Sequence, residues 1–77
     1  MANKARILAV DDDAIMREAL RDTLAAEGYG VVAVETAMAA VAELERAEVD
    51  VVLADLSLPR VSGLELLDRI RRSWPAT

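Results

Sequence analysis

Residues 7–13 read Ile-Leu-Ala-Val-Asp-Asp-Asp, a short apolar run that ends abruptly in three acids. Two further apolar runs follow: Val-Val-Ala-Val at residues 31–34, and Val-Val-Leu-Ala at residues 51–54, which ends at Asp55. Short apolar runs without alternation are typical of strands that are buried on both faces of a parallel sheet. We therefore predict three parallel strands, each buried on both sides.

A helix is predicted between the first two runs, over residues 14–27. Its apolar positions recur four residues apart, and Gly28 follows as a C-terminal stop. The recurring residues, which we expect to face the core, are Met16, Leu20 and Leu24. The charged residues between them predict a solvated helix face made of Arg17, Glu18, Arg21 and Asp22.

Two more helices are predicted further along the chain. Residues 37–47 place their apolar side chains on one helical face, and Thr36 is the expected N-cap. The third helix is expected to start at Ser62, which has the spacing of a capping box with Glu65. Its apolar stripe consists of Leu66, Leu67, Ile70 and Trp74.

The resulting order of elements is β-α-β-α-β-α. Such an alternation predicts right-handed crossovers and an α/β fold with helices on both faces of a parallel sheet. A length of 77 residues allows one small domain and excludes an enzyme with separate cofactor and substrate lobes.

Composition excludes several classes of site. The chain has no cysteine and no histidine, so thiolate or imidazole metal sites and histidine phosphoacceptors are ruled out. A net charge of −5 argues against nucleic-acid binding by this chain, because phosphate backbones require a basic footprint. The apolar runs are too short for a signal peptide or a membrane span, so we expect a cytoplasmic location and no membrane contact.

Three acids follow the predicted strands directly. Asp11 and Asp12 come after the first strand and Asp55 comes after the third, at the edge where parallel sheets form their sites. If these strands are neighbours, the carboxylates converge and need a cation to neutralise them. An oxygen-only cluster suits Mg²⁺, and a carboxylate beside it can attack phosphorus to give an aspartyl phosphate.

A purely local interpretation of these acids is also open. Acids before a helix cap its N–H groups, which is the favoured interpretation for Asp13 and an equal alternative for Asp11 and Asp12. Asp55 alone could begin an Asx turn. The joint pattern of acids after two strands favours a shared site.

The segment 7–13 resembles the opening of a response-regulator receiver domain, whose first strand ends in an acidic pair. Residues 55–63, which read Asp-Leu-Ser-Leu-Pro-Arg-Val-Ser-Gly, resemble the phosphoacceptor segment of the same family. The resemblance covers residues 6–77. It implies a flavodoxin-like fold with strand order 2-1-3 and a phosphoacceptor module of a two-component phosphorelay, which is not an enzyme.

The resemblance also implies roles for single residues. Asp55 matches the aspartate that takes a phosphoryl group from a histidine kinase or a histidine phosphotransfer protein. Asp12 and Asp55 match the carboxylates on Mg²⁺, the backbone carbonyl of Ser57 matches a further ligand, and Asp11 is expected to act mainly through metal-bound water. Two further features, Leu58-Pro59 and Gly63, are expected to shape the loop into the third helix.

The chain departs from the family in its number of units. The resemblance implies five β-α units, so we expect residues 1–77 to form a partial receiver domain that lacks the fourth and fifth units. The Ser/Thr of the fourth strand and the Lys of the fifth have no match here. This leaves a second hypothesis open, a truncated or degenerate receiver that binds or dimerises without stable phosphorylation.

A third hypothesis, an aspartyl-phosphate phosphohydrolase, is disfavoured because such sites have a D-x-D motif and residue 57 is Ser.

The three-unit arrangement also leaves the apolar strand 51–54 at the edge of the sheet. An unpaired strand edge is a template for pairing with another chain, so we expect self-association through it.

Overall fold

The computed structural model describes residues 5–58 and 62–77, so the predictions for Pro59 lie outside the described residues. Its strands are β1 (Arg6–Val10), β2 (Gly30–Val34) and β3 (Val51–Ala54), and its helices are α1 (Ala14–Ala26), α2 (Ala37–Arg46) and α3 (Gly63–Ser73). The strands form one parallel sheet in the order β2-β1-β3. The predicted α/β class and strand order are confirmed.

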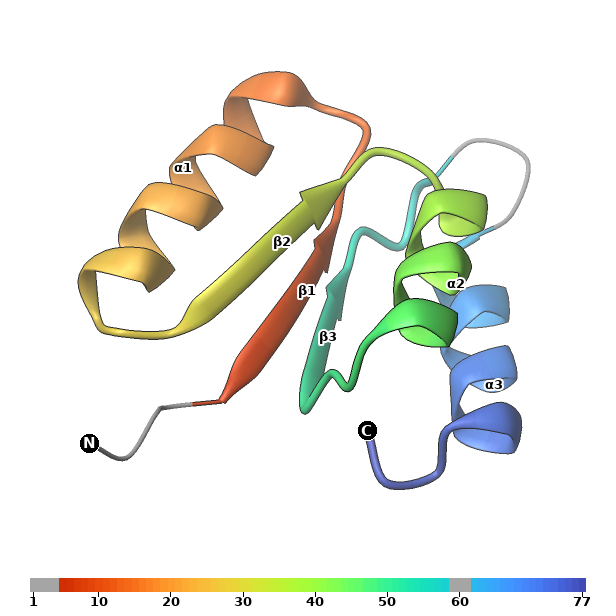
Figure 1. The fold of residues 1–77 in the computed structure, drawn as a ribbon. Coiled ribbons are helices and arrows are strands. Elements are labelled where there is room, and N and C mark those ends of the chain that lie inside the picture. Colours follow the sequence, from red (N-terminus) through yellow and green to blue (C-terminus); the bar gives the residue numbers. More distant parts are fainter. Residues whose placement is uncertain (1–4, 59–61) are drawn as a thin grey trace.

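The helices divide between the two faces of the sheet, with α1 on one side and α2 and α3 on the other (Figure 1). The main core lies between the sheet and the pair of helices. Its buried members are Leu8, Val10, Ala37, Ala40, Leu44, Val49, Leu58, Leu66 and Ile70. The predicted inner faces of α2 and α3 supply most of these side chains.

The prediction of burial on both faces is correct for β1, holds in part for β2, whose residues 31–34 are all half-buried, and is wrong for β3. Ile7, Leu8, Ala9 and Val10 are all buried, because β1 is central and covered on both sides. In β3, Val52 and Ala54 pack against the core, whereas Val51 and Leu53 are 41% and 40% exposed. Successive side chains of a strand point to opposite faces, and α1 packs over β1 and β2, so the α1-side face of β3 stays open.

Helix α1 is more exposed than its periodicity predicts. Asp13 caps its N-terminus, and Gly28, with φ of 92°, follows its C-terminal end as expected. However, no residue of α1 is fully buried, and Met16 is 47% exposed. In the part of the chain that the structure describes, α1 is the one helix on this face, so no second helix encloses its flanks.

The predicted caps of α2 and α3 are present. The Thr36 hydroxyl accepts a hydrogen bond from Ala39 N at 3.0 Å, and the Ser62 hydroxyl accepts one from Glu65 N at 3.2 Å. The Ser62 hydroxyl also donates to a Glu65 carboxylate oxygen at 3.4 Å, a side-chain contact in place of the backbone N–H bond that a full capping box has. Trp74 ends α3 and packs, half-buried, against the core.

Candidate functional site

The sheet continues for one hydrogen bond beyond the ends of β1 and β3, and this places the acids. Asp55 N–H donates to Val10 O at 2.9 Å, and Asp11 N–H donates to Val34 O at 3.0 Å. The register of β1 and β3 pairs Val10 with Ala54, so Asp11 and Asp55 are the next residues of adjacent strands. Both acids therefore emerge side by side at the carboxyl edge of the sheet.

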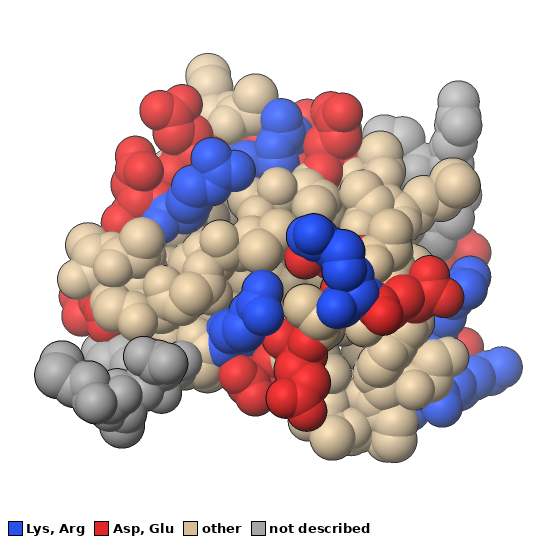
Figure 2. Space-filling model, in the orientation of Figure 1, with Lys and Arg blue, Asp and Glu red and all other residues tan. Residues whose placement is uncertain are grey.

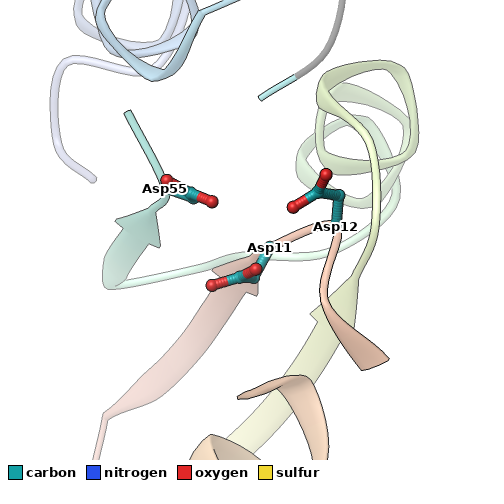
Figure 3. Close-up of side chains that lie close together, drawn as sticks. All are labelled: Asp11, Asp12 and Asp55. Carbon is teal, nitrogen blue, oxygen red and sulfur yellow. The ribbon is translucent and has the colours of Figure 1, made fainter. Parts of the chain in front are cut away.

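Asp11, Asp12 and Asp55 form one carboxylate cluster. One oxygen of each lies within 4.8 Å of the others. The side chains of Asp12 and Asp55 point towards each other across the gap between the two strand ends, with Asp11 beside them (Figure 3). Asp11 and Asp55 are half-buried and Asp12 is exposed. The convergence expected from the strand order is present.

Local hydrogen bonds hold two members of the cluster. Asp11 Oδ1 accepts from Asp13 N and Asp55 Oδ1 accepts from Ser57 N, both at 2.9 Å. The Asx turn proposed for Asp55 is therefore present together with the convergence. Each carboxylate keeps further lone pairs, because an ionised carboxylate has about four acceptor sites.

Asp12 and Asp13 differ sharply although they are neighbours. Asp13 caps α1 by accepting from Ile15 N at 2.9 Å and Met16 N at 3.4 Å, as the local interpretation predicts. Within residues 5–58 and 62–77, the Asp12 carboxylate accepts no hydrogen bond and forms no ion pair. Asp12 therefore has acceptor capacity for a ligand, whereas Asp13 has a structural role.

The donor set fits a hard divalent cation. All three side chains offer carboxylate oxygen, and Mg²⁺ binds oxygen at about 2.0–2.1 Å in octahedral geometry, so ligands on opposite sides stand about 4 Å apart. The separations of up to 4.8 Å in the cluster come close to this span. Three anionic groups at this distance also repel one another, which favours a bound cation.

The turn after Asp55 is held by residues on either side of it. Ser57 is exposed, and Leu58 is buried in the core at 6% exposure. The first residue of α3, Gly63, lies so close that a Cβ atom there would stand 2.3 Å from the Asp55 carbonyl oxygen. The expected role of Gly63 in the loop thus becomes a direct contact with the backbone of Asp55.

Arg17 is the residue that sequence reasoning misplaced. Instead of lying on a solvated face, its side chain is only 21% exposed, and its guanidinium donates to the backbone carbonyl of Asp11 at 3.0 Å. The same nitrogen is 3.9 Å from a carboxylate oxygen of Glu35. The spacing could have predicted this contact. Arg17 lies four residues after Asp13, and helical side chains lean towards the N-terminus of the helix, so Arg17 can reach the segment before α1.

The acidic edge is an open surface. A hollow of about 560 Å³ lies elsewhere, between the α2–β3 connection and residues 73–77. On the face visible in Figure 2, Arg side chains alternate with Asp and Glu and do not gather into one basic patch. No helix within the described ranges is long and apolar enough to cross a membrane.

Comparisons with known proteins agree with this architecture. The family model described as "Response regulator receiver domain" matches residues 7–77. The response regulator protein FleR of Pseudomonas aeruginosa is 42% identical over 71 residues, which are 92% of this chain and 15% of FleR.

Solved structures give the same picture. TrrA of Thermotoga maritima, a response regulator solved in complex with Mg²⁺-BeF, aligns with a TM-score of 0.88 and 35% identity, over 94% of this chain and 63% of TrrA. TrrA in complex with the histidine kinase ThkA aligns with a TM-score of 0.85 and 36% identity, over 91% of this chain and 60% of the solved one. The chain thus spans less than two thirds of each of these proteins.

Proposed function

Because the chain belongs to the response regulator receiver domain family of two-component systems, we propose that it accepts a phosphoryl group on Asp55. The observation that carries the proposal is the convergence of Asp11, Asp12 and Asp55 within 4.8 Å at the carboxyl edge of the sheet. Residues 1–77 would supply the acidic half of a receiver site.

In the proposed reaction, a carboxylate oxygen of Asp55 attacks the phosphorus of a phosphohistidine. A P–O bond forms to Asp55 while the P–N bond breaks, and the electron pair returns to the imidazole nitrogen. The Ser57 N–H, which donates to Asp55 Oδ1, holds the nucleophile in place. Transfer of this kind depends mainly on positioning and on charge neutralisation.

We propose that Asp12 and Asp55 hold Mg²⁺ directly, with the Ser57 carbonyl as a further ligand and Asp11 acting through water. A bound Mg²⁺ supplies the positive charge that offsets the carboxylates and the phosphoryl oxygens. The support is the all-oxygen donor set and the unpaired Asp12 carboxylate described above. TrrA, which is similar in fold, was solved with Mg²⁺-BeF.

Incubation of the chain with Mg²⁺ and acetyl phosphate tests the proposal. We expect an acid-stable, base-labile adduct that carries one phosphoryl group on Asp55. Asp55→Asn should abolish the adduct. Asp13→Asn is the matched control, because Asn retains the helix cap and Asp13 adjoins the cluster without belonging to it. A folded wild-type chain that forms no adduct would support the alternative, a receiver that binds partners without phosphorylation.

The proposed phosphodonor is a histidine kinase or a histidine phosphotransfer protein. The supporting observation is that exposed apolar residues flank the acids along the chain: Ile15 at 81% and Met16 at 47% exposure at the start of α1, and Leu56 at 58% directly after Asp55. TrrA was solved in complex with a histidine kinase. Ile15→Glu should slow transfer from a kinase that phosphorylates the wild type and leave labelling by acetyl phosphate unchanged.

We also propose that the 77-residue chain alone pairs with a second copy through β3. Within the described residues β3 has a hydrogen-bonded neighbour on one side only, and its residues Val51 and Leu53 are substantially exposed. Pairing of two such edges would satisfy backbone groups and cover apolar surface. Sedimentation velocity over a range of concentrations tests this, and a monomer at all concentrations would contradict it.

A further inference from the structure

The peptide that joins Asp11 to Asp12 is fixed from several sides. Asp11 N–H donates to Val34 O on β2, and Asp11 Oδ1 accepts from Asp13 N. The Asp11 carbonyl accepts from the Arg17 guanidinium at 3.0 Å in a half-buried setting. Because a peptide unit is planar, a hydrogen bond to the Asp11 carbonyl also sets the direction in which Asp12 leaves the strand.

Arg17 itself is anchored by its surroundings. It lies on α1, its side chain is 21% exposed, and its backbone N–H makes the first helical hydrogen bond to Asp13 O at 3.0 Å. The nitrogen that reaches Asp11 also lies 3.9 Å from Glu35, which follows β2. The guanidinium therefore connects the segment after β1, the start of α1 and the segment after β2.

We propose that Arg17 is a positioning residue for the acidic site, which orients Asp12 towards Asp55 by holding the Asp11–Asp12 peptide. The proposal rests on the proposed function, because it concerns the binding of Mg²⁺ by the carboxylates. Asp12 needs such support, since its own carboxylate has no hydrogen-bond partner in the described part of the chain. Residues that orient metal ligands typically change affinity by about 10–100-fold when they are removed.

Charge and positioning predict opposite results for Arg17→Ala. If Arg17 acted only through its positive charge, its removal would make the site more negative and would tighten Mg²⁺ binding. If Arg17 positions Asp12, its removal weakens binding. We expect Mg²⁺ binding, measured by calorimetric titration of the full chain with the metal alone, to weaken about tenfold in Arg17→Ala. The Mg²⁺ affinity of Arg17→Lys should lie between those of Arg17→Ala and the wild type, because lysine keeps the positive charge but lacks the planar guanidinium.

Arg21→Ala is the matched control. Arg21 lies one turn further along α1, is exposed, and its loss changes the net charge by the same amount. Its Mg²⁺ affinity should equal or slightly exceed that of the wild type. If Arg17→Ala does not fold, Arg17→Lys provides the test, since it keeps the positive charge: an effect of charge alone predicts unchanged Mg²⁺ affinity, whereas loss of the guanidinium contact with the Asp11 carbonyl predicts weaker binding.

A second measurement needs no metal. The amide of Asp13 donates to Asp11 Oδ1 and reports the turn, so its NMR order parameter should fall in Arg17→Ala and remain unchanged in Arg21→Ala. If Arg17→Ala binds Mg²⁺ as tightly as the wild type or more tightly, and the order parameter of its Asp13 amide is unchanged, the positioning role of Arg17 is wrong. The proposed metal site would still stand. A folded wild-type chain that binds no Mg²⁺ would overturn the proposed metal site as well.

Discussion

Gly63 lies directly against the backbone of Asp55. A Cβ atom on Gly63 would stand 2.3 Å from the carbonyl oxygen of Asp55 and 2.8 Å from the Cα atom of Leu56, closer than van der Waals contact allows. Both of these neighbours are backbone atoms, so neither can rotate away as a side chain would. The start of α3 can therefore approach the proposed acceptor only because residue 63 has no side chain.

Gly63→Ala should consequently disturb both stability and the site. We expect the free energy of unfolding to fall by about 1–3 kcal/mol, the range seen when a packed region is overfilled. We also expect slower labelling by acetyl phosphate, because the backbone of Asp55 must move. Urea denaturation and the rate of adduct formation measure the two effects.

Gly30→Ala is the control for this substitution. A Cβ atom on Gly30 would meet only Arg6 Cγ, at 3.5 Å, which is an ordinary contact. Alanine in a strand is favoured over glycine by about 0.5–1 kcal/mol, so this variant should be as stable as the wild type or more so. Equal losses of stability in the two variants would show that the close approach at Gly63 has no special effect.

The fold could be predicted because each local pattern agreed with the next. The apolar runs, the caps at Thr36 and Ser62, and the alternation of strands and helices all pointed to one parallel sheet, which is present. The convergence of the acids followed, since it depends only on which strands are adjacent. The register of Val10 with Ala54 then brings Asp11 beside Asp55.

What could not be predicted depends on contacts between elements. Periodicity shows which residues of α1 share a face, but it does not show how completely that face is covered, so the exposure of Met16 was missed. The same limit applies to Arg17, whose position on a charged face suggested solvent although its guanidinium reaches the Asp11 carbonyl. Likewise, the close approach of Gly63 to Asp55 depends on how α3 packs against the segment after β3, and the sequence spacing of these residues does not reveal that packing.

Asp12→Asn should make the metal-free chain more stable and remove its response to Mg²⁺. Loss of one of three clustered charges relieves repulsion, which is worth about 1 kcal/mol or less for an exposed group in high dielectric. In the wild type, Mg²⁺ at about 100 times its dissociation constant should add about 2.7 kcal/mol to the free energy of unfolding. Urea denaturation with and without Mg²⁺ measures both effects.

Asp22→Asn is the comparison for Asp12→Asn, because Asp22 is exposed on α1 and lies outside the cluster. It should respond to Mg²⁺ as the wild type does. If the two variants behave alike, the effect belongs to net charge and not to the site.

The cap on α1 can be separated from the acidic cluster by two substitutions at one position. Asp13→Ala removes the acceptor for Ile15 N and Met16 N, and should lower the free energy of unfolding by about 1 kcal/mol. Asp13→Asn keeps an acceptor and should cost much less. Neither change should abolish Mg²⁺ binding, measured by denaturation with and without the metal or by titration, because Asp13 is outside the cluster. Loss of Mg²⁺ binding in Asp13→Asn would instead place Asp13 among the metal ligands.

Leu53→Lys should reduce self-association of the 77-residue chain without unfolding it. Leu53 is 40% exposed on the edge strand β3, and a lysine there disfavours pairing with another edge. Met38→Lys introduces the same charge at a residue that is 82% exposed on α2, a helix that packs against β1 and α3. Because β3 is the proposed interface, sedimentation velocity should show a shift towards monomer for Leu53→Lys and none for Met38→Lys. An equal shift in both would mean that the chains associate through general apolar surface and not through the strand.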